Sequence, residues 1–355
     1  MEKIGLLTIH DTLNYGSLLQ TYSLYKAVET LGMNIELIDY KCKTIAARET
    51  TYALHECKSV KDIIKSLMWH KAMQEKKDNF SQFTRNNMRL SREYTVENIR
   101  EANNNYNTFL VGSDIVWGTE ITGYDWTYFL DFVNEDKIKL AFSSSVGTRW
   151  KDEYDQKISK YLSRFNDISV REELAQEWIG KLGVESCVTC DPTMLWDTEF
   201  WKKMLNKKNA KEDPYVVVYM WTKDMRTISH AKEYAKKYGF KVKCQQFYNP
   251  IKGVENVKPT SLEDWISLIA NAKAVFTASY HGLLYSLYFH KNVYYYNREN
   301  KSRMVSLGKE LRISNRDMQN EFVEQAEIDY DYVDAKLCEK RDYSWNVLRK
   351  MLKKN

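Results

Sequence analysis

The strongest constraint on the fold lies in the first forty residues, where two short apolar runs flank a helical pattern. Residues 3–9 and 34–40 are apolar runs of strand length, and residues 10–17 are mostly polar. Between them, apolar side chains recur at helical spacing over residues 18–31. A strand, a polar loop, a helix and a second strand within such a short stretch predict a βαβ unit and therefore a parallel sheet.

The same alternation continues along the chain and predicts an α/β protein with two Rossmann-like domains facing across a cleft. Further strands are expected at 107–111, 138–142, 168–170, 184–189, 215–221, 241–247, 274–277 and 292–296, and helices at 172–182, 196–205, 228–238, 261–271 and 283–289.

We place the first domain at residues 1–195 and the second at 196–316, followed by a C-terminal helical segment at 317–355. A basic helical insertion is expected at about 58–100 in the first domain, because residues 58–90 hold eight Lys or Arg against three acids. A solvated helix that packs one apolar stripe on its domain is the favoured interpretation of this insertion. Peripheral contact with an anionic membrane surface is the alternative.

Composition excludes several classes of protein. Of the 355 residues, 43% are hydrophobic and 28% are charged, which is typical of a folded globular chain. The net charge of +5 is too small to predict nucleic-acid binding, and no apolar run approaches the roughly 20 residues of a membrane span. The six cysteines suit a cytoplasmic protein, and Cys187 and Cys190 are interpreted as part of a strand with no bound metal. The oligomeric state is left open.

Candidate site residues follow from a rule for doubly wound sheets, in which ligands bind beyond the carboxyl ends of the strands. This rule selects five short polar loops, which lie at residues 14–17, 112–114, 143–147, 171–172 and 279–282. Loops rich in small residues allow the backbone to approach an anion closely.

Three side chains near these loops are candidates for chemistry. His281 follows an apolar strand and precedes a helix, where an imidazole can transfer a proton or hold an anion; the alternative is a structural His bonded to a backbone carbonyl. Arg171 follows a strand and suits bidentate binding of an anion, or an ion pair with Glu172 or another acid. Arg303 is a second candidate anion ligand, although its spacing alone suggests ordinary surface charge.

Six groups of motifs, in order from residue 3 to about 316, resemble the polysaccharide pyruvyl transferase family. The resemblance rests on residues 3–8 with 14–20, 109–117 with 128–132, 169–172, 191–193, 279–282 and 302–303. The sequence departs from the family pattern at Ala278, where family members frequently have Asp, and at Ile115-Val116-Trp117-Gly118.

The resemblance implies a GT-B-like fold and transfer of pyruvate from phosphoenolpyruvate onto two hydroxyls of a sugar, with release of phosphate. The expected partners are phosphoenolpyruvate as co-substrate and a glycan acceptor from a surface-polysaccharide precursor, which is expected to be lipid-linked. No other cofactor and no metal are expected. His281 and Asp114 are the expected catalytic residues. The donor is expected to contact Arg171, Arg303, Ser279 and Gly282, and the acceptor to contact Asn14, Tyr15, Gly16 and Ser113.

Two other functions remain open at this point. A GT-B glycosyltransferase that uses a sugar nucleotide would share the fold, because fold does not fix function. A glycan-binding protein without catalysis is the other alternative, and Ala278 motivates it.

Overall fold

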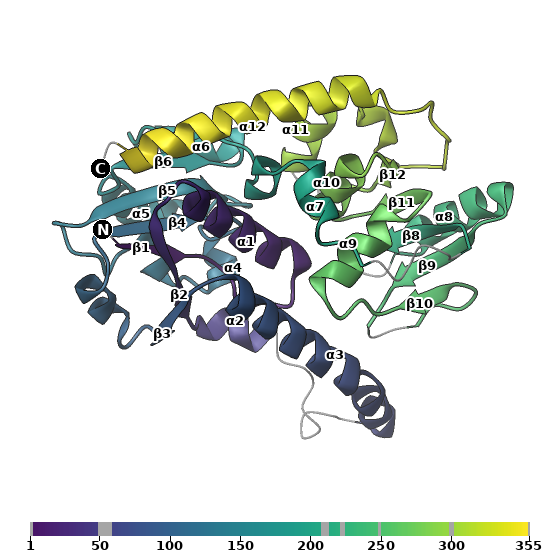
Figure 1. Ribbon diagram of the computed structural model, residues 1–355, viewed down its shortest axis with the longest axis horizontal. Helices are drawn as coiled ribbons and strands as arrows, with labels where there is room; N and C mark the ends of the chain where they lie inside the picture. Colours follow the sequence, from purple (N-terminus) through teal and green to yellow (C-terminus); the bar gives the residue numbers. More distant parts are fainter. Residues whose placement is uncertain are drawn as a thin grey trace. The chain divides into compact units, whose positions relative to one another are not determined.

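A computed structural model describes residues 3–48, 59–206, 213–220, 224–247, 250–297 and 302–353. The chain divides into two compact units. Unit 1 comprises residues 1–50, 80–196 and 339–355, and unit 2 comprises residues 51–79 and 197–338. Each unit contains its own parallel β-sheet (Figure 1).

The sheet of unit 1 has seven parallel strands in the order β3-β2-β1-β4-β5-β6-β7. This is the order of a Rossmann sheet with one further strand at its edge. The elements of unit 1 are β1 (Lys3–Leu7), α1 (Tyr15–Thr30), β2 (Asn34–Tyr40), α2 (Lys43–Arg48), β3 (Leu90–Tyr94), η2 (Ile99–Asn104), β4 (Thr108–Gly112), α4 (Thr119–Thr122), η3 (Trp126–Phe129), β5 (Ile138–Ser144), η4 (Asp152–Tyr154), α5 (Asp155–Leu162), β6 (Asp167–Val170), α6 (Glu173–Lys181), β7 (Cys187–Val188) and η5 (Pro192–Leu195).

The core of unit 1 is built by alternation along the strands. Phe109 and Val111 of β4 share a buried cluster with Ile158 of α5 and Ile179 of α6. The intervening residue Leu110 is also fully buried, so both faces of the sheet are covered. Burial on both faces explains why these strands are nearly continuous apolar runs in the sequence.

Unit 2 repeats the topology with five parallel strands in the order β10-β9-β8-β11-β12. The elements of unit 2 are α7 (Thr198–Lys202), β8 (Tyr215–Tyr219), α8 (Met225–Tyr238), β9 (Lys241–Gln245), β10 (Glu255–Val257), α9 (Leu262–Ala270), β11 (Ala274–Thr277), α10 (Tyr280–Tyr288), β12 (Asn292–Tyr295), α11 (Ser302–Glu310) and η7 (Ser314–Arg316).

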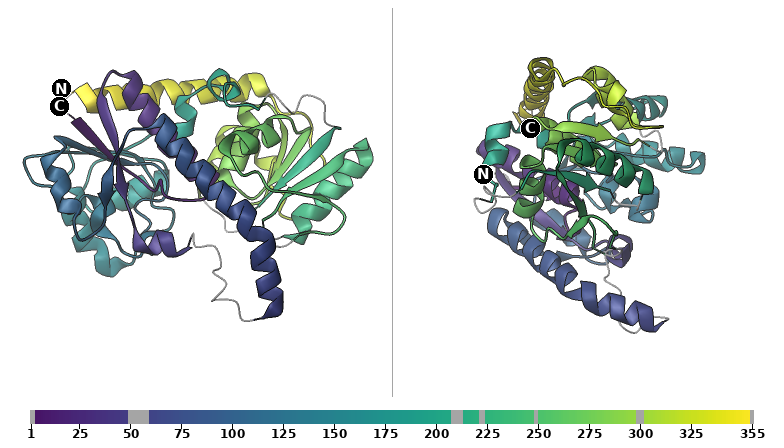
Figure 2. Two further views of the ribbon diagram at one scale, coloured as in Figure 1. Left: turned by 60° about the horizontal axis from the view of Figure 1, so that its bottom comes forward. Right: turned by 90° about the vertical axis from the view of Figure 1, so that its right-hand side faces the viewer.

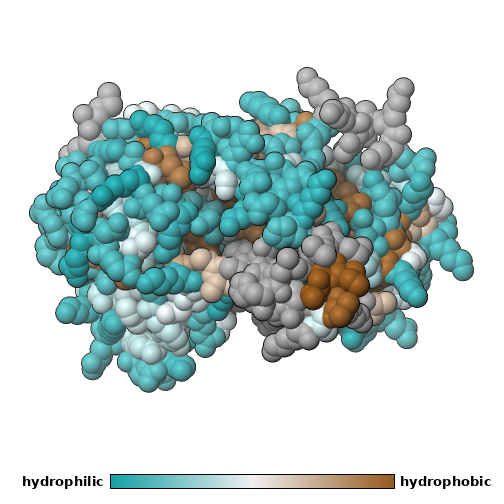
Figure 3. Space-filling model, turned by 90° about the horizontal axis from the view of Figure 1, so that it is seen from below, coloured by the Kyte–Doolittle hydropathy of each residue, from teal (hydrophilic) through white to brown (hydrophobic). Residues whose placement is uncertain are grey.

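Helices cover both faces of the second sheet as well (Figure 2). On one face, Val216 and Phe276 pack in a cluster with Ile228 and Tyr234 of α8. On the other, the ring of Trp265 in α9 lies 5.3 Å from that of Tyr219 and 5.1 Å from that of Tyr285 in α10. With two such cores buried, the face of the molecule in Figure 3 is mostly hydrophilic.

Two long helices contribute residues to both units, and both differ from the expected segments. α3 (Val60–Asn87) ends before residue 88, and the rest of the expected 58–100 insertion forms β3 and η2 instead. α12 (Tyr330–Lys353) begins inside the expected C-terminal segment, and its residues from 339 onward belong to unit 1. No helix among the described residues is long and apolar enough to cross a membrane.

The expected βαβ alternation and the parallel sheets are confirmed. β2 has the expected bounds, whereas α1 and α10 each begin three residues earlier than their apolar patterns suggest. Their capping residues, Asn14 and Ser279, explain the difference, because a side-chain cap sets where a helix begins. β3 and β10 were not predicted from the sequence, because these edge strands are short and partly exposed and so lack a continuous apolar run. Residue 221, the last of the expected strand 215–221, lies outside the described residues.

Candidate functional site

The strand order of each unit reverses at one point, and ligands of doubly wound sheets bind beyond the carboxyl ends of the strands at that point. In unit 1 the reversal lies between β1 and β4, and in unit 2 it lies between β8 and β11. The loop after β4 contains Ser113 and Asp114, and the turn after β11 leads into His281. Topology therefore places two expected catalytic residues, one in each unit, where a ligand site is anticipated.

In unit 2, Ser279 fixes the start of α10. Its side-chain oxygen accepts a hydrogen bond from the backbone N–H of Gly282 at 3.3 Å, and its own N–H donates to the Thr277 hydroxyl at 3.0 Å. His281 lies in the first helical turn and is 7% exposed. A helix N-terminus presents free N–H groups and the positive end of the helix dipole, which together favour an anion.

Arg303 of α11 and His281 both contact the ring of Tyr280. The guanidinium carbon of Arg303 is 5.0 Å from the centre of the Tyr280 ring, a cation–π distance. The Tyr280 ring in turn meets the His281 ring edge to face, with 5.5 Å between their centres. The structure thus brings an expected catalytic residue, His281, and an expected donor ligand, Arg303, to one aromatic side chain. The sequence analysis did not select Tyr280, although it stands directly before His281.

Gly282 allows the close packing of this turn. A Cβ at this position would lie 2.3 Å from Thr277 Oγ1 and 2.8 Å from Cδ1 of Tyr219. Any side chain would therefore push α10 away from β8 and β11. The predicted donor contact at Gly282 stays a prediction, while its packing role is visible.

In unit 1, Asn14 caps α1 and Asp114 bonds to the same helix. The Asn14 side chain accepts from the backbone N–H of Gly16 at 3.0 Å and of Ser17 at 3.4 Å. The Ser17 hydroxyl donates to the Asp114 carboxylate. Ser113 and Asp114 have φ of 69° and 51°, in the left-handed region that costs energy for residues other than glycine. Such strain clusters at functional sites and supports Asp114 as a candidate.

Arg171 is held within a buried polar network. Its side chain is 1% exposed; Nη1 donates to the Asp191 carboxylate at 2.9 Å, and Nε donates to Glu172 at 3.3 Å. Gln20 also donates to Asp191, and the Ser113 hydroxyl donates to Gln20 at 2.8 Å. The ion pair with an acid, which the sequence left open, is therefore present. The sequence analysis missed Gln20 and Asp191 as members of this network, although Asp191 stands in a motif that it singled out.

Other predicted acceptor residues of unit 1 are largely buried. Tyr15 is 1% exposed and packs edge to face against Phe80 with 5.4 Å between ring centres. Ser113 is fully buried, and Gly16 is buried in the first turn of α1. Their contact with an acceptor stays a prediction. In the parts of the chain that the structure describes, no group of three His, Cys, Asp or Glu side chains is arranged to hold a metal ion.

Solved structures with the same overall fold are distant in sequence. UDP-GlcNAc 2-epimerase from Methanocaldococcus jannaschii, in complex with UDP-GlcNAc and UDP, matches with a TM-score of 0.52 and 10% identity, covering 100% of both chains. UDP-GlcNAc 2-epimerase from Neisseria meningitidis, bound to UDP-GlcNAc, matches with a TM-score of 0.51 and 9% identity, again covering 100% of both chains. The similarity confirms a GT-B-like fold of two Rossmann-like domains. No curated protein sequence matches this chain significantly.

The family comparison is more specific than the structural one. The model of the family described as polysaccharide pyruvyl transferase matches residues 14–300, which is most of the chain. The matched range includes Asn14 at its start, as well as Asp114, Arg171 and His281. The chain therefore belongs to the polysaccharide pyruvyl transferase family.

Proposed function

We propose that this protein transfers pyruvate from phosphoenolpyruvate onto two hydroxyls of a sugar in a surface-polysaccharide precursor. The product is a cyclic ketal, and inorganic phosphate is released. The observation that carries the proposal is the arrangement of His281 in the first turn of α10 beside Tyr280 and Arg303. An imidazole, a guanidinium and a helix N-terminus together suit a small phosphorylated carboxylate.

The reaction needs both a proton donor and anion binding. A sugar hydroxyl attacks C2 of the enol and loses its proton to a base while another proton is added to C3, so the methylene becomes a methyl group. The C2–O bond to phosphate then breaks, positive charge develops at C2, and the second hydroxyl closes the ketal and loses its proton. We assign proton delivery at C3 to His281 and binding of the donor's anionic groups to Arg303, Ser279 and the N–H groups that begin α10.

The residues of unit 1 take supporting roles in this proposal. Asp114 is a candidate base for a sugar hydroxyl, because its carboxylate is already oriented by the Ser17 hydroxyl. Arg171, whose Nη1 and Nε are bonded to Asp191 and Glu172, is a further candidate contact for the donor. Acceptor contacts by Asn14, Tyr15, Gly16 and Ser113 belong to the same proposal.

The test is release of phosphate by the purified full chain with phosphoenolpyruvate and a panel of glycan acceptors. We expect His281→Asn to lower the rate by about 10²- to 10⁴-fold, the usual contribution of a general acid. His290→Asn is the matched control, because His290 lies in the same unit and pairs with Asp334 at the surface. An unchanged rate in His281→Asn would remove His281 from the mechanism.

Thermal-shift measurements with candidate donors separate the competing functions. Stabilisation by phosphoenolpyruvate supports the proposal, because a ligand that binds the native state raises its stability. Stabilisation by nucleotide sugars alone would favour a GT-B glycosyltransferase. Glycan binding with no donor binding would favour a non-catalytic member of the family.

We further propose that the acceptor is lipid-linked and that the protein works at the cytoplasmic face of the membrane. Val60, Ile63 and Ile64 at the start of α3 are 73%, 39% and 54% exposed, and the helix is rich in lysine. Exposed apolar side chains near basic ones favour an anionic lipid surface. Co-sedimentation with anionic vesicles should fall in Ile63→Ser/Ile64→Ser, and binding that is unchanged would contradict the membrane contact.

A further inference from the structure

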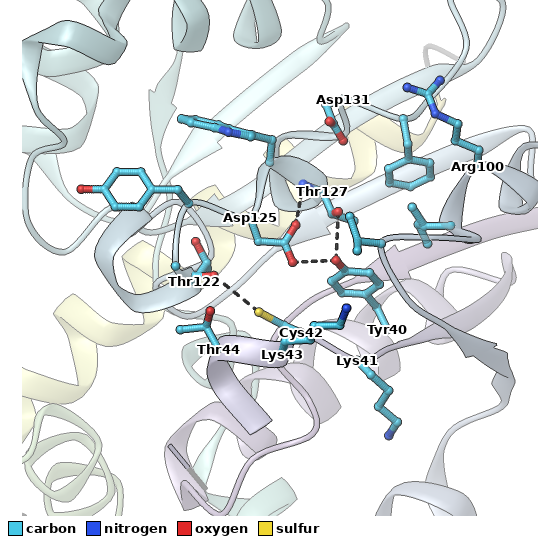
Figure 4. A pocket seen from close by; sticks show the side chains of 16 residues that line it. Tyr40, Lys41, Cys42, Lys43, Thr44, Arg100, Thr122, Asp125, Thr127 and Asp131 are labelled. Carbon is cyan, nitrogen blue, oxygen red and sulfur yellow. Dashed lines mark hydrogen bonds between the residues drawn. The ribbon is translucent and has the colours of Figure 1, made fainter. Parts of the chain in front are cut away.

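A pocket of about 360 Å³ opens in unit 1 near the carboxyl end of β2, and none of the residues assigned so far lines it (Figure 4). Three chain segments line it, at residues 40–44, 96–100 and 122–132. Its volume lies within the range of about 300–1,000 Å³ that is usual for small-molecule sites. All three segments belong to unit 1, so the pocket is formed within one unit.

Both lysines of the pocket are paired with carboxylates. Lys41 pairs with Asp11 and Asp39 at 2.9 Å, and Lys43 pairs with Glu97 at 2.6 Å. The lining also carries Arg100 and the carboxylates of Asp125 and Asp131.

The lining itself holds three basic and two acidic groups, and its two lysines are already paired with Asp11, Asp39 and Glu97. A neutral polyol would find both hydrogen-bond donors and acceptors in such a lining.

One carboxylate of the pocket is held in a fixed orientation. The Tyr40 hydroxyl donates to Asp125 Oδ2 at 2.6 Å, and the Thr127 hydroxyl donates to the Tyr40 oxygen at 3.1 Å (Figure 4). Asp125 Oδ1 accepts from the backbone N–H of Thr127 at 3.1 Å. Each carboxylate oxygen retains capacity to accept another hydrogen bond, so Asp125 is a preorganised acceptor.

A second carboxylate, that of Asp131, lies in the same lining. Burial is the largest cause that raises the pKa of Asp131, followed by the nearby charge of Asp125. A carboxylate with reduced access to water forms stronger hydrogen bonds with ligand hydroxyls, because few water molecules compete for it.

Aromatic side chains form another part of the lining. Tyr124 and Trp126 lie 6.4 Å apart between ring centres, and both pack near Tyr154, at 5.0 Å and 5.6 Å. The Lys157 ammonium lies 4.2 Å from the centre of the Trp126 ring. Trp and Tyr offer a rigid apolar surface with a polar edge, and the C–H face of a pyranose ring stacks on such surfaces.

Left-handed backbone occurs in this lining and directly beside it, and it is strained at Tyr124 and Leu130 but not at Gly123. Gly123 and Tyr124 both have positive φ, of 67° and 59°, and Leu130, next to Asp131, has φ of 55°. A Cβ at Gly123 would lie 2.1 Å from Oγ1 of Thr44, so only glycine permits this approach of two lining segments. Strained backbone that is retained next to a polar pocket supports a binding role.

From this combination we propose that the pocket binds a neutral pyranose unit. Asp125 and Asp131 accept hydrogen bonds from its hydroxyls, and Tyr124 and Trp126 provide the apolar contact. That this sugar is part of the acceptor glycan rests on the proposed function; the binding of a neutral sugar does not.

The test is calorimetric titration of the full chain, without donor, using methyl glycosides of glucose, galactose, mannose and N-acetylglucosamine. We expect saturable binding of at least one of them, and hydrogen exchange should slow in residues 40–44 and 122–132 when it is bound. Asp131→Asn should weaken that binding by about tenfold or more, because hydrogen bonds to charged groups are the stronger ones. Trp126→Phe should weaken it several-fold.

Matched controls keep the result interpretable. Asp136→Asn removes a carboxylate whose side chain is 71% exposed, and Trp178→Phe changes an aromatic side chain packed on the same core from α6. Both should bind the glycoside as the unsubstituted protein does. Circular dichroism of all four variants establishes that the fold is retained.

The outcomes separate this inference from the proposed function. Glycoside binding that depends on Asp131, without phosphate release from phosphoenolpyruvate, would support the pocket and count against pyruvyl transfer. Phosphate release with no glycoside binding, and with an acceptor KM unchanged in Asp131→Asn, would overturn the pocket alone. Binding of inorganic phosphate or phosphoenolpyruvate that is lost in Asp131→Asn or Trp126→Phe would also overturn it.

Discussion

The two units share one topology but use the carboxyl edges of their sheets differently. In unit 1 this edge holds a closed ionic network, in which Arg171 is bonded to Asp191 and Glu172 and every one of these side chains is 5% exposed or less. In unit 2 the edge holds a helix N-terminus with His281 and Tyr280, and Arg303 lies over the Tyr280 ring.

The difference shows that an arginine near a strand end has two distinct uses. A guanidinium bonded to buried carboxylates stabilises the loops around it, and removing it leaves uncompensated charge. A guanidinium beside a helix N-terminus is suited to bind an anion through its planar N–H fork. We therefore expect unit 1 to depend on Arg171 for stability and unit 2 to depend on Arg303 for donor binding.

Loss of Arg171 is the strongest test of this comparison. Arg171→Met should lower the free energy of unfolding by about 3–5 kcal/mol, because Asp191 and Glu172 would remain buried without it. Urea denaturation measures the loss, and hydrogen exchange assigns it to unit 1. Arg149→Met, which removes partly exposed ion pairs with Asp152 and Asp155, should cost less, about 1 kcal/mol. Equal stability of Arg171→Met and the unsubstituted protein would contradict a structural role.

Loss of Arg303 should affect binding more than stability. Arg303→Ala should weaken phosphoenolpyruvate binding by about tenfold to a hundredfold, which calorimetry measures, and should cost about 0.5–1 kcal/mol of stability. Arg312→Ala is a close control, because Arg312 lies 4.1 Å from the Tyr332 ring centre in the same unit. If both variants bind the donor equally well, Arg303 is an ordinary surface cation.

A glycine in each unit tests how tightly the helices pack. Gly282→Ala should destabilise unit 2 by about 1–3 kcal/mol, because its Cβ would overlap Thr277 Oγ1 and the Tyr219 ring. Gly180→Ala in α6 should be neutral or stabilising by up to about 1 kcal/mol, since nothing lies within 4 Å of its Cβ position. Thermal unfolding compares the two. A Gly282→Ala variant as stable as Gly180→Ala would show that α10 can move away from β11 without cost.

Acid sensitivity gives the smallest expected effect. Burial alone would raise the pKa of Asp39, but hydrogen bonds from His10 and Lys41 lower it to about 2. The pKa of an Asp in the unfolded chain is about 3.9. The ionised carboxylate therefore stabilises the folded state above that pH, and this contribution to stability is lost as pH falls towards 2. Asp39→Asn should remove on the order of 1 kcal/mol at pH 7 and flatten the profile between about pH 4 and pH 2. A profile that is as steep in Asp39→Asn as in Asp136→Asn would contradict this.

Much of the fold could be predicted because buried parallel strands are continuous apolar runs. Six strands have bounds within two residues of those expected, namely β2, β4, β5, β8, β11 and β12. The partly exposed edge strands β3 and β10 have no such run. The place of His281 at a strand-to-helix turn was also predicted, because an apolar strand precedes it and Gly282 and an apolar helix follow it.

The sequence by itself determined the α/β class, the two repeats of one topology and the family, because apolar periodicity and ordered motifs are local properties of the chain. Only the tertiary structure decided which partners the charged residues have. Arg171 and Asp191 are twenty residues apart, and Gln20 is 171 residues from Asp191, yet they meet in one network. Likewise, Tyr40 meets Asp125 across 85 residues to form the pocket. Contacts of this kind follow from strand order and packing, which no local pattern contains.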